Sequence, residues 1–245
     1  MRNLFLFMLL VGIFMFSRNG LNNGFFKLFN INSVNGQGPV KTELRAISSF
    51  KSITMNIAGD VEFSVSDQYS VEVQAQENLL PILKTVVEGE NLRISFEQNV
   101  RSEENILIKI SAPTIEAFDL AGSGNIRVLT PLKNEKLKLD ITGSGNIFVT
   151  QADVADLYCS VTGSGVVELG GKAQKVTAAV GGSGAINARN LNAEIMEADI
   201  SGSGDVECTV AQTLKANVSG SGNVRYGGSP QVDSRVSGSG AIEKF

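Results

Sequence analysis

Four acidic residues in one short segment are the side chains best placed to do chemistry. They are Glu197, Asp199, Asp205 and Glu207, spaced by two on either side of a Gly-Ser-Gly triplet. In an extended strand, this spacing points all four carboxylates outward. Paired carboxylates can hold Ca²⁺ or act as acid and base on a glycan. The cluster supports one hypothesis, a glycan-active β-helix enzyme of the lyase or hydrolase kind.

The neighbours of this acidic cluster favour a simpler interpretation. In the repeat register described below, Arg225 lies between Glu207 and Glu243, and Lys215 lies beside Glu197. Opposite charges on adjacent strands stabilise a sheet as cross-strand pairs. A repetitive Ca²⁺-binding β-roll would also carry an Asp in every turn, and this chain does not. We therefore expect a structural role for the four carboxylates, with neither a catalytic nor a metal site.

Composition excludes several other classes of function. The chain has no His, so neither imidazole-activated nucleophiles nor His-ligated metals are available. The net charge is −4, and no basic face suited to nucleic acid is visible. We expect no cofactor and no nucleic-acid partner.

The Gly-Ser-Gly triplets recur at a nearly fixed interval. Their middle residues are Ser123, Ser144, Ser164, Ser183, Ser203, Ser221 and Ser239. A phosphate-binding loop would lead into a helix, but each triplet here is followed by alternating apolar residues. A period near twenty residues is instead typical of a solenoid, in which each unit buries its apolar face against its neighbours.

The apolar alternation runs straight through each triplet. Leu139, Ile141, Gly143, Gly145 and Ile147 all share one parity. The pattern therefore predicts a bent strand with both glycines turned inward and the serine outward. The corner glycines would be Gly122, Gly124, Gly143, Gly145, Gly163, Gly165, Gly182, Gly184, Gly202, Gly204, Gly220, Gly222, Gly238 and Gly240.

Stacked coils would align the seven serines in one surface column. Thr142, Thr162, Ser201, Ser219 and Ser237 lie two residues before their triplet serines and widen the column into a hydroxyl strip. Such a strip is either a solvated corner of small residues or a face for glycan or protein contact. We treat the seven serines as a candidate surface ladder.

Each repeat is long enough for three short sides. This predicts an all-β fold for residues 118–245, a right-handed parallel β-helix of about 18–21 residues per coil, because parallel crossovers are nearly always right-handed. Residues 37–117 should form a β-rich cap. Within it, residues 53–65 are a shortened copy of the motif, residues 77–86 are the one short helix, and a hairpin turns at residues 88–91. The last strand leaves an edge through which the protein could self-associate.

Residues 1–36 are predicted to be a targeting segment with a linker. The apolar run from Leu4 to Phe16 fits a signal peptide, or an N-terminal membrane anchor if it is not cleaved. The two cysteines, Cys159 and Cys208, have the inward parity and lie two coils apart, beyond the reach of a disulfide. We expect buried free thiols.

The chain resembles a known family over residues 36–245. The resemblance rests on "VNGQGPVKTELRAISSFKSITMNIAGDVEFSV", on "VEVQAQENLLPILKTVVEGENLRISFEQ" and on the serial "GSGNI" and "GSGDV" units. These are similar to the DUF2807 family, described as the "putative auto-transporter adhesin, head GIN domain" and common in Bacteroidota. The resemblance implies an exported protein with a β-helix-like fold, and it transfers no site residues.

The leading hypothesis is therefore an exported, non-enzymatic β-solenoid of the periplasm or outer surface, acting as an adhesin-like binding or scaffold protein. Its partner would be a surface glycan or a protein. A membrane would be contacted only through an uncleaved N-terminal segment. The glycan-active enzyme built on the acidic cluster is the alternative.

Overall fold

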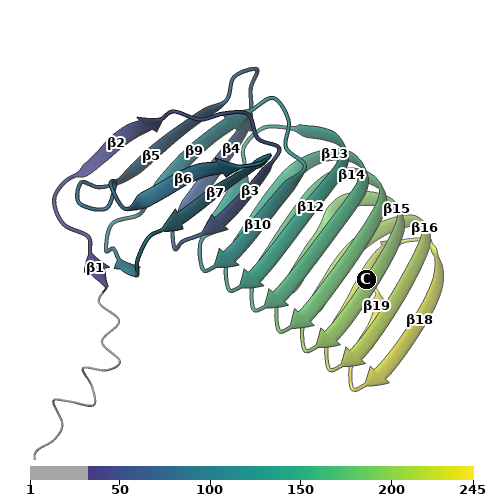
Figure 1. Cartoon of the computed structure of the whole chain (residues 1–245). Coiled ribbons are helices and arrows are strands. Elements are labelled where there is room, and N and C mark those ends of the chain that lie inside the picture. The colour runs from purple at the N-terminus through teal and green to yellow at the C-terminus, as the bar shows by residue number, and fades with distance from the viewer. Residues whose placement is uncertain (1–32) are drawn as a thin grey trace, which may run out of the picture.

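The computed structural model describes residues 33–245, so the predicted targeting segment lies outside the described residues. All regular structure in that range is β-strand. Among residues 33–245, no helix has the length and apolarity needed to cross a membrane. The strands form a rod of stacked coils with a β-rich cap at its N-terminal end (Figure 1).

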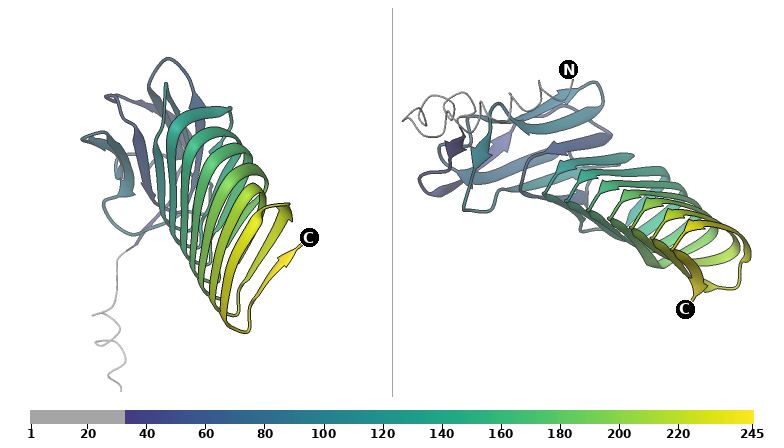
Figure 2. Two further views of the ribbon diagram at one scale, coloured as in Figure 1. Left: turned by 90° about the vertical axis from the view of Figure 1, so that its right-hand side faces the viewer. Right: turned by 90° about the horizontal axis from the view of Figure 1, so that it is seen from below.

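The rod is a parallel β-solenoid, as the repeat predicts. Figure 2 shows the coils following one another along a single axis. Every pairing between successive coils is parallel. The strands are β10 (Ala117–Gly122), β11 (Asn125–Val128), β12 (Leu132–Gly143), β13 (Asn146–Gly163), β14 (Val166–Gly182), β15 (Ala185–Gly202), β16 (Asp205–Gly220), β17 (Asn223–Gly228), β18 (Gln231–Gly238) and β19 (Ala241–Lys244).

Each coil has three faces, which burial distinguishes within β13. The post-triplet face buries Ile147 and Val149, the middle face buries Ala152 and Val154, and the pre-triplet face buries residues 157, 159 and 161. Two consecutive non-buried residues separate each face from the next. The inward side chains stack on their counterparts in the adjoining coils and make one core that runs through the rod and the cap.

The coils differ in length only where the middle face begins or ends. Register shifts occur between Val149 and Ala152, between Glu168 and Gly170, and on both sides of the middle face in β15. The pre-triplet face and the triplet keep an unbroken register, as from Asp156↔Lys175 to Gly163↔Gly182. The triplet is therefore the fixed corner of the coil.

The two glycines of a triplet have different roles, which corrects the expectation that both face inward. Gly145 is buried, and a Cβ there would lie 2.6 Å from the Leu120 side chain. Gly143 is only half-buried and has a φ of 128°, a backbone conformation that L side chains rarely adopt. A Cβ on Gly143 would lie 2.5 Å from the carbonyl oxygen of Gly122 in the preceding coil. A Cβ on Gly145 would also lie 2.4 Å from the carbonyl oxygen of Gly124. Both glycines therefore allow close approach of the preceding coil; the first is also required by its backbone dihedral, and the second also leaves room for a core side chain.

The cap continues the pre-triplet and post-triplet faces of the rod before closing them. β3 (Ser52–Asn56) and β4 (Asp60–Val65) pair in parallel with β10 and β11, so the shortened motif copy forms a coil. β7 (Asn91–Phe96) and β9 (Leu107–Ala112) stack in parallel on β3 and β4. Beyond them the pairing becomes antiparallel, with β6 (Leu83–Glu88), β5 (Ser70–Gln76) and β2 (Val40–Arg45). The short β1 (Val34–Asn35) pairs with β8 (Val100–Arg101).

Two local expectations for the cap had opposite outcomes. The hairpin is confirmed, because Glu88 pairs with Asn91 across a two-residue turn whose Gly89 has a φ of 66°. The helix at residues 77–86 is wrong. Residues 77–82 form a turn, and β6 begins at Leu83. Pro81 cannot donate a backbone hydrogen bond, and Leu79, Leu80 and Leu83 are buried by the core without a helical continuation.

The C-terminal strands are more open than the rest of the rod. Val236 and Phe245 expose 45% and 47% of their surface, and Val232 and Ile242 are only partly buried. Self-association through this edge stays a prediction.

Candidate functional site

The seven triplet serines form a column on the fixed corner of the rod. All seven are exposed. From Ser144 onward, the backbone amides of the six later serines donate to carbonyl oxygens of the preceding coil, as from Ser144 to Gly122 at 2.9 Å and from Ser164 to Gly143 at 2.8 Å. Within residues 33–245, none of the seven hydroxyl groups has a side-chain hydrogen bond in the structure. The column therefore presents a row of hydroxyl groups that are free to contact a partner.

The adjoining hydroxyl strip follows the pre-triplet face. Thr142, Thr162, Gly181, Ser201, Ser219 and Ser237 are in register from coil to coil. Gly181 interrupts the hydroxyl groups of the strip. The strip borders a shallow groove of about 550 Å³ whose polar edge includes Asp199, Asn217 and Arg235.

The acidic cluster does not form one site. Glu197 and Asp199 lie on the pre-triplet face, whereas Asp205 and Glu207 lie beyond the corner on the post-triplet face. All four side chains point outward, but in two directions. In the part of the chain that the structure describes, no three acidic or thiol side chains are grouped so that they could hold a metal ion.

Charge pairing and amide contacts account for most of the cluster. The Arg225 guanidinium lies 3.3 Å from Glu207 and 3.4 Å from Glu243. These two carboxylates raise the pKa of Arg225 through hydrogen bonds. Asn217 donates to Asp199 at 2.8 Å. Lys215 is opposite Glu197 in the register, although no ion pair joins them in the described structure.

The post-triplet face carries a second polar column. Asn146 donates its side-chain amide to Asn125 at 2.8 Å, and Asn125 donates to Asp60 at 2.7 Å. Asn105 also donates to Asp60, at 3.0 Å. These bonds tie the first coils of the rod to the cap, where Asp60 begins β4.

The thiols are buried and unpaired, as expected. Both Cys159 and Cys208 are free and fully inaccessible to solvent. Burial raises the pKa of Cys208 to about 12. Burial, and then the nearby Asp140 carboxylate, raises the pKa of Cys159 well above its usual range. Neither thiol is placed to act as a nucleophile.

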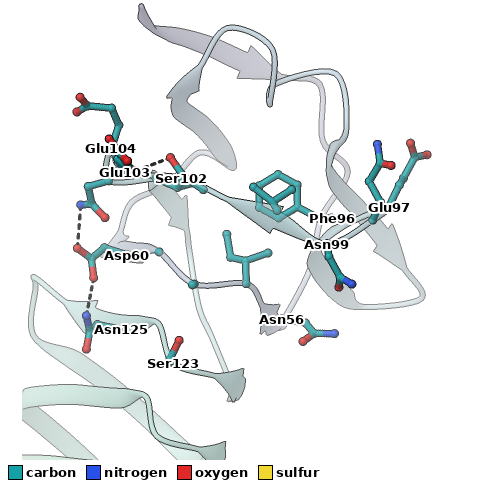
Figure 3. A pocket seen from close by; sticks show the side chains of 17 residues that line it. Asn56, Asp60, Phe96, Glu97, Asn99, Ser102, Glu103, Glu104, Ser123 and Asn125 are labelled. Carbon is teal, nitrogen blue, oxygen red and sulfur yellow. Dashed lines mark hydrogen bonds between the residues drawn. The ribbon is translucent and has the colours of Figure 1, made fainter. Parts of the chain in front are cut away.

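A polar pocket of about 740 Å³ lies where the cap meets the rod (Figure 3). Its walls come from the β3–β4 corner, from the segment between β7 and β9, and from the first triplet. The side chains include Asn56, Phe96, Asn99, Ser102 and Asn105. In Figure 3 the Phe96 ring lies between Ser102 on one side and Asn99 on the other.

The lining of the pocket is mainly acidic. It includes Asp60, Glu97, Glu103 and Glu104 and no Lys or Arg. Two of these carboxylates are paired from outside the lining, Asp60 with Arg127 at 3.4 Å and Glu97 with Lys84 at 3.3 Å. Asp60 is already bonded to Asn105 and Asn125, as the dashed lines in Figure 3 show. The remaining amides and carboxylates offer both donors and acceptors to a ligand.

The pocket is continuous with the serine column. Ser123, the first serine of the column, and Asn125 both line it. Sequence reasoning missed the pocket because residues 97–106 contain neither a repeat nor a motif. The available signal was the density of polar residues in "EQNVRSEEN", between two strands that the pattern did predict.

Comparison with protein families gives one match, over residues 49–230. It is to the DUF2807 model, described as "Putative auto-transporter adhesin, head GIN domain". A search of curated proteins finds no match.

Solved structures share the fold. A crystal structure titled as a putative adhesin from Bacteroides fragilis has 25% sequence identity and a TM-score of 0.83, covering 87% of this chain and 100% of that one. One titled as a putative lipid binding protein from Parabacteroides distasonis has 27% identity and a TM-score of 0.76, with the same coverage. A third, titled as a putative adhesin from Parabacteroides merdae, has 25% identity and a TM-score of 0.72, covering 87% and 99%.

Proposed function

The chain belongs to the DUF2807 family, and from this premise we propose that it is an exported, non-enzymatic binding protein of the cell surface or periplasm. The names of its structural neighbours support an adhesin-like role. The apolar run from Leu4 to Phe16 supports export. The division of the acidic cluster between two faces supports a non-enzymatic role, because the four carboxylates of the glycan-active alternative do not converge on one site.

The observation that carries the proposal is the polar pocket at the cap end of the serine column. Its volume of about 740 Å³ suits a small ligand or the end of a longer one. A glycan chain seated there could continue along the column, because Ser123 belongs to both surfaces. The column then supplies repeated hydroxyl contacts at the spacing of adjacent strands, about 4.8 Å.

The chemistry of the pocket favours a neutral glycan. Amide and carboxylate side chains can pair with sugar hydroxyl groups as both donors and acceptors. The half-buried Phe96 ring offers an apolar surface for the C–H side of a sugar. Asp60 and Glu97 are paired with Arg127 and Lys84. Glu103 and Glu104 have no ion pair among the described residues, and their carboxylates would repel sialylated or sulfated glycans.

A glycan array probed with the full chain tests this proposal. We expect binding to neutral oligosaccharides and weaker binding to their sialylated or sulfated counterparts. Asn99→Arg places a long side chain in the pocket from an exposed position, and it should reduce binding at least tenfold. Asn192→Arg, an exposed change on the middle face, is the matched control and should leave binding unchanged.

A second pair of variants separates the pocket from the column. Ser123→Arg lies in both surfaces, whereas Ser221→Arg lies in the column far from the cap. Loss of binding in the first variant alone assigns affinity to the pocket, and loss in both assigns it to the whole surface. Absence of binding to any neutral glycan, or equal binding by all four variants, would overturn the proposal.

A further inference from the structure

We propose that two copies of the chain form a twofold-symmetric dimer by pairing their β2 strands edge to edge. This inference goes beyond the proposed function, because it concerns assembly and not ligand binding. β2 is the outermost strand of the cap in Figure 1. Within residues 33–245 it pairs only with β5, so its second edge is free.

The alternation of hydrogen bonds identifies which groups face the free edge. β2 is antiparallel to β5, with Val40 opposite Gln76 and Arg45 opposite Val71. The amide of Glu77 donates to the carbonyl oxygen of Pro39, which makes that pair a hydrogen-bonded one. Hydrogen-bonded pairs alternate along an antiparallel ladder. The backbone groups of Val40, Thr42 and Leu44 therefore point away from β5.

The side chains of β2 are exposed on both faces. Val40 and Leu44 expose 47% and 72% of their surface and share the outer face of the sheet with Thr42. Lys41 and Glu43 lie on the opposite face, in register with the buried Ala75 and Val73. Within the chain, Lys41 is paired with Glu77 at 2.5 Å and Glu43 with Arg45 at 3.3 Å, and all four side chains stay partly exposed to a second copy. Exposed apolar residues on a free edge are the features that pair with another strand.

The sequence of β2 is complementary to itself in one antiparallel register. With the twofold axis at Thr42, Val40 lies opposite Leu44 of the second copy, and Lys41 lies opposite its Glu43. Each contact occurs twice by symmetry. In this register the Thr42–Thr42 pair and the two Val40–Leu44 pairs are the hydrogen-bonded ones. The register therefore uses the backbone groups of β2 that point away from β5.

Neighbouring registers are disfavoured by charge. An axis at Lys41 or at Glu43 would place that residue opposite its own copy, and like charges directly opposite one another destabilise a sheet. An axis at Leu44 overlaps fewer residues of the strand. An axis at Thr42 therefore combines the longest stretch of paired residues with opposite charges facing each other across the interface.

The dimer should be weak and dependent on concentration. One six-residue strand from each chain makes the contact. Interfaces that bury less than about 1,200 Å² are typical of transient complexes. Two adhesin-like rods joined at their caps would nevertheless engage a surface bivalently, which raises apparent affinity without new contacts.

Charge reversal tests the register. Sedimentation velocity is measured on the full chain in mild detergent, which keeps the apolar N-terminal run from associating. We expect the wild type to be a dimer at high concentration, and Lys41→Glu and Glu43→Lys each to be monomers. An equimolar mixture of these two variants should dimerise again, because across the interface each changed residue then faces an opposite charge, although Lys41→Glu still loses the pair with Glu77 within its own chain. The double variant with both changes should also dimerise.

Crosslinking tests the position of the axis. Paired residues at a hydrogen-bonded site have Cα atoms about 5.5 Å apart, within disulfide range. Thr42→Cys should therefore form a covalent dimer under mild oxidation, whereas Gln68→Cys, at an exposed site elsewhere in the cap, should not. The native thiols are buried and do not compete. A wild type that stays monomeric, or a dimer that none of the charge changes affects, refutes the proposal.

Discussion

The side-chain amide of Asn146 donates a 2.8 Å hydrogen bond to the side chain of Asn125, one coil nearer the cap. The two residues occupy the same place after consecutive triplets, and they are also Cα partners in the parallel ladder. This one hydrogen bond therefore joins equivalent residues of two repeats and agrees with the register of the ladder.

Removal of the Asn125 side chain should loosen the junction between cap and rod. Asn125→Ala breaks the bonds to Asp60 and Asn146. A net loss of roughly 1–2 kcal/mol in unfolding free energy is expected. Denaturant unfolding followed by circular dichroism measures it. Asn192→Ala is the control, since the structure shows no side-chain hydrogen bond for this exposed residue, and an equal loss there would contradict the assigned role.

The first glycine of a triplet should not tolerate a side chain. Gly143→Ala combines an unfavourable φ of 128° with a Cβ that lies 2.5 Å from a backbone oxygen. We expect a loss of at least about 2 kcal/mol in unfolding free energy. Gly181→Ala is the matched control on the pre-triplet face, because its Cβ would meet only the Thr162 hydroxyl at 4.0 Å. Similar midpoints for the two variants would show that the corner relaxes.

The buried thiols should make the fold sensitive to alkali. Burial raises the pKa of Cys208 from 9.0 to about 12, and that of Cys159 is raised as well. The folded state therefore holds these protons where the unfolded state has released them. Their contribution to stability is complete below about pH 9 and falls as the pH rises toward 12, by up to about 1.4 kcal/mol per pH unit for each thiol.

The measurement compares the wild type with a Cys159→Ala, Cys208→Ala double variant across that pH range. The difference in unfolding free energy between them should shrink as the pH rises, while lysine and tyrosine titration affects both proteins alike. A constant difference would mean that the thiols are accessible in the folded state. Native thiols should also resist a water-soluble thiol reagent until denaturant is added.

Chelation of divalent ions should leave thermal stability unchanged. Glu207 is already paired with Arg225 at 3.3 Å, and the remaining carboxylates of the acidic cluster lie on two different faces. The unfolding midpoint is compared with EDTA and with added CaCl₂. A shift of several degrees on adding Ca²⁺ would revive the metal-site hypothesis for this segment.

The coil was predictable because one parity persists through every triplet. Ile141, Gly145 and Ile147 share it, and all three are buried. The same alternation correctly predicted that Cys159 and Cys208 are buried in the core. It could not separate the two glycines, since alternation describes side-chain direction and the first glycine is fixed by a backbone dihedral.

The cap was less predictable because its pairings are not repeated. The segment containing Pro81 has apolar residues at helical spacing, and tertiary burial of Leu79 and Leu83 decided its conformation instead. The pocket depends on residues 97–106, whose position is set by strands on both sides of it. Because residues 97–106 belong to no repeat, the sequence does not indicate which strands they lie beside, and the pocket could not be located from it.

The register shifts at the borders of the middle face have a consequence for how this rod can change. Extra residues are absorbed there without disturbing the fixed corner, as the differing coils of the chain already demonstrate. Foreign peptides inserted after Thr150, which is exposed, should be displayed on the flank of an intact rod. Duplication of a whole coil should lengthen the rod by one strand spacing, so gene duplication can adjust its reach in steps of a single repeat.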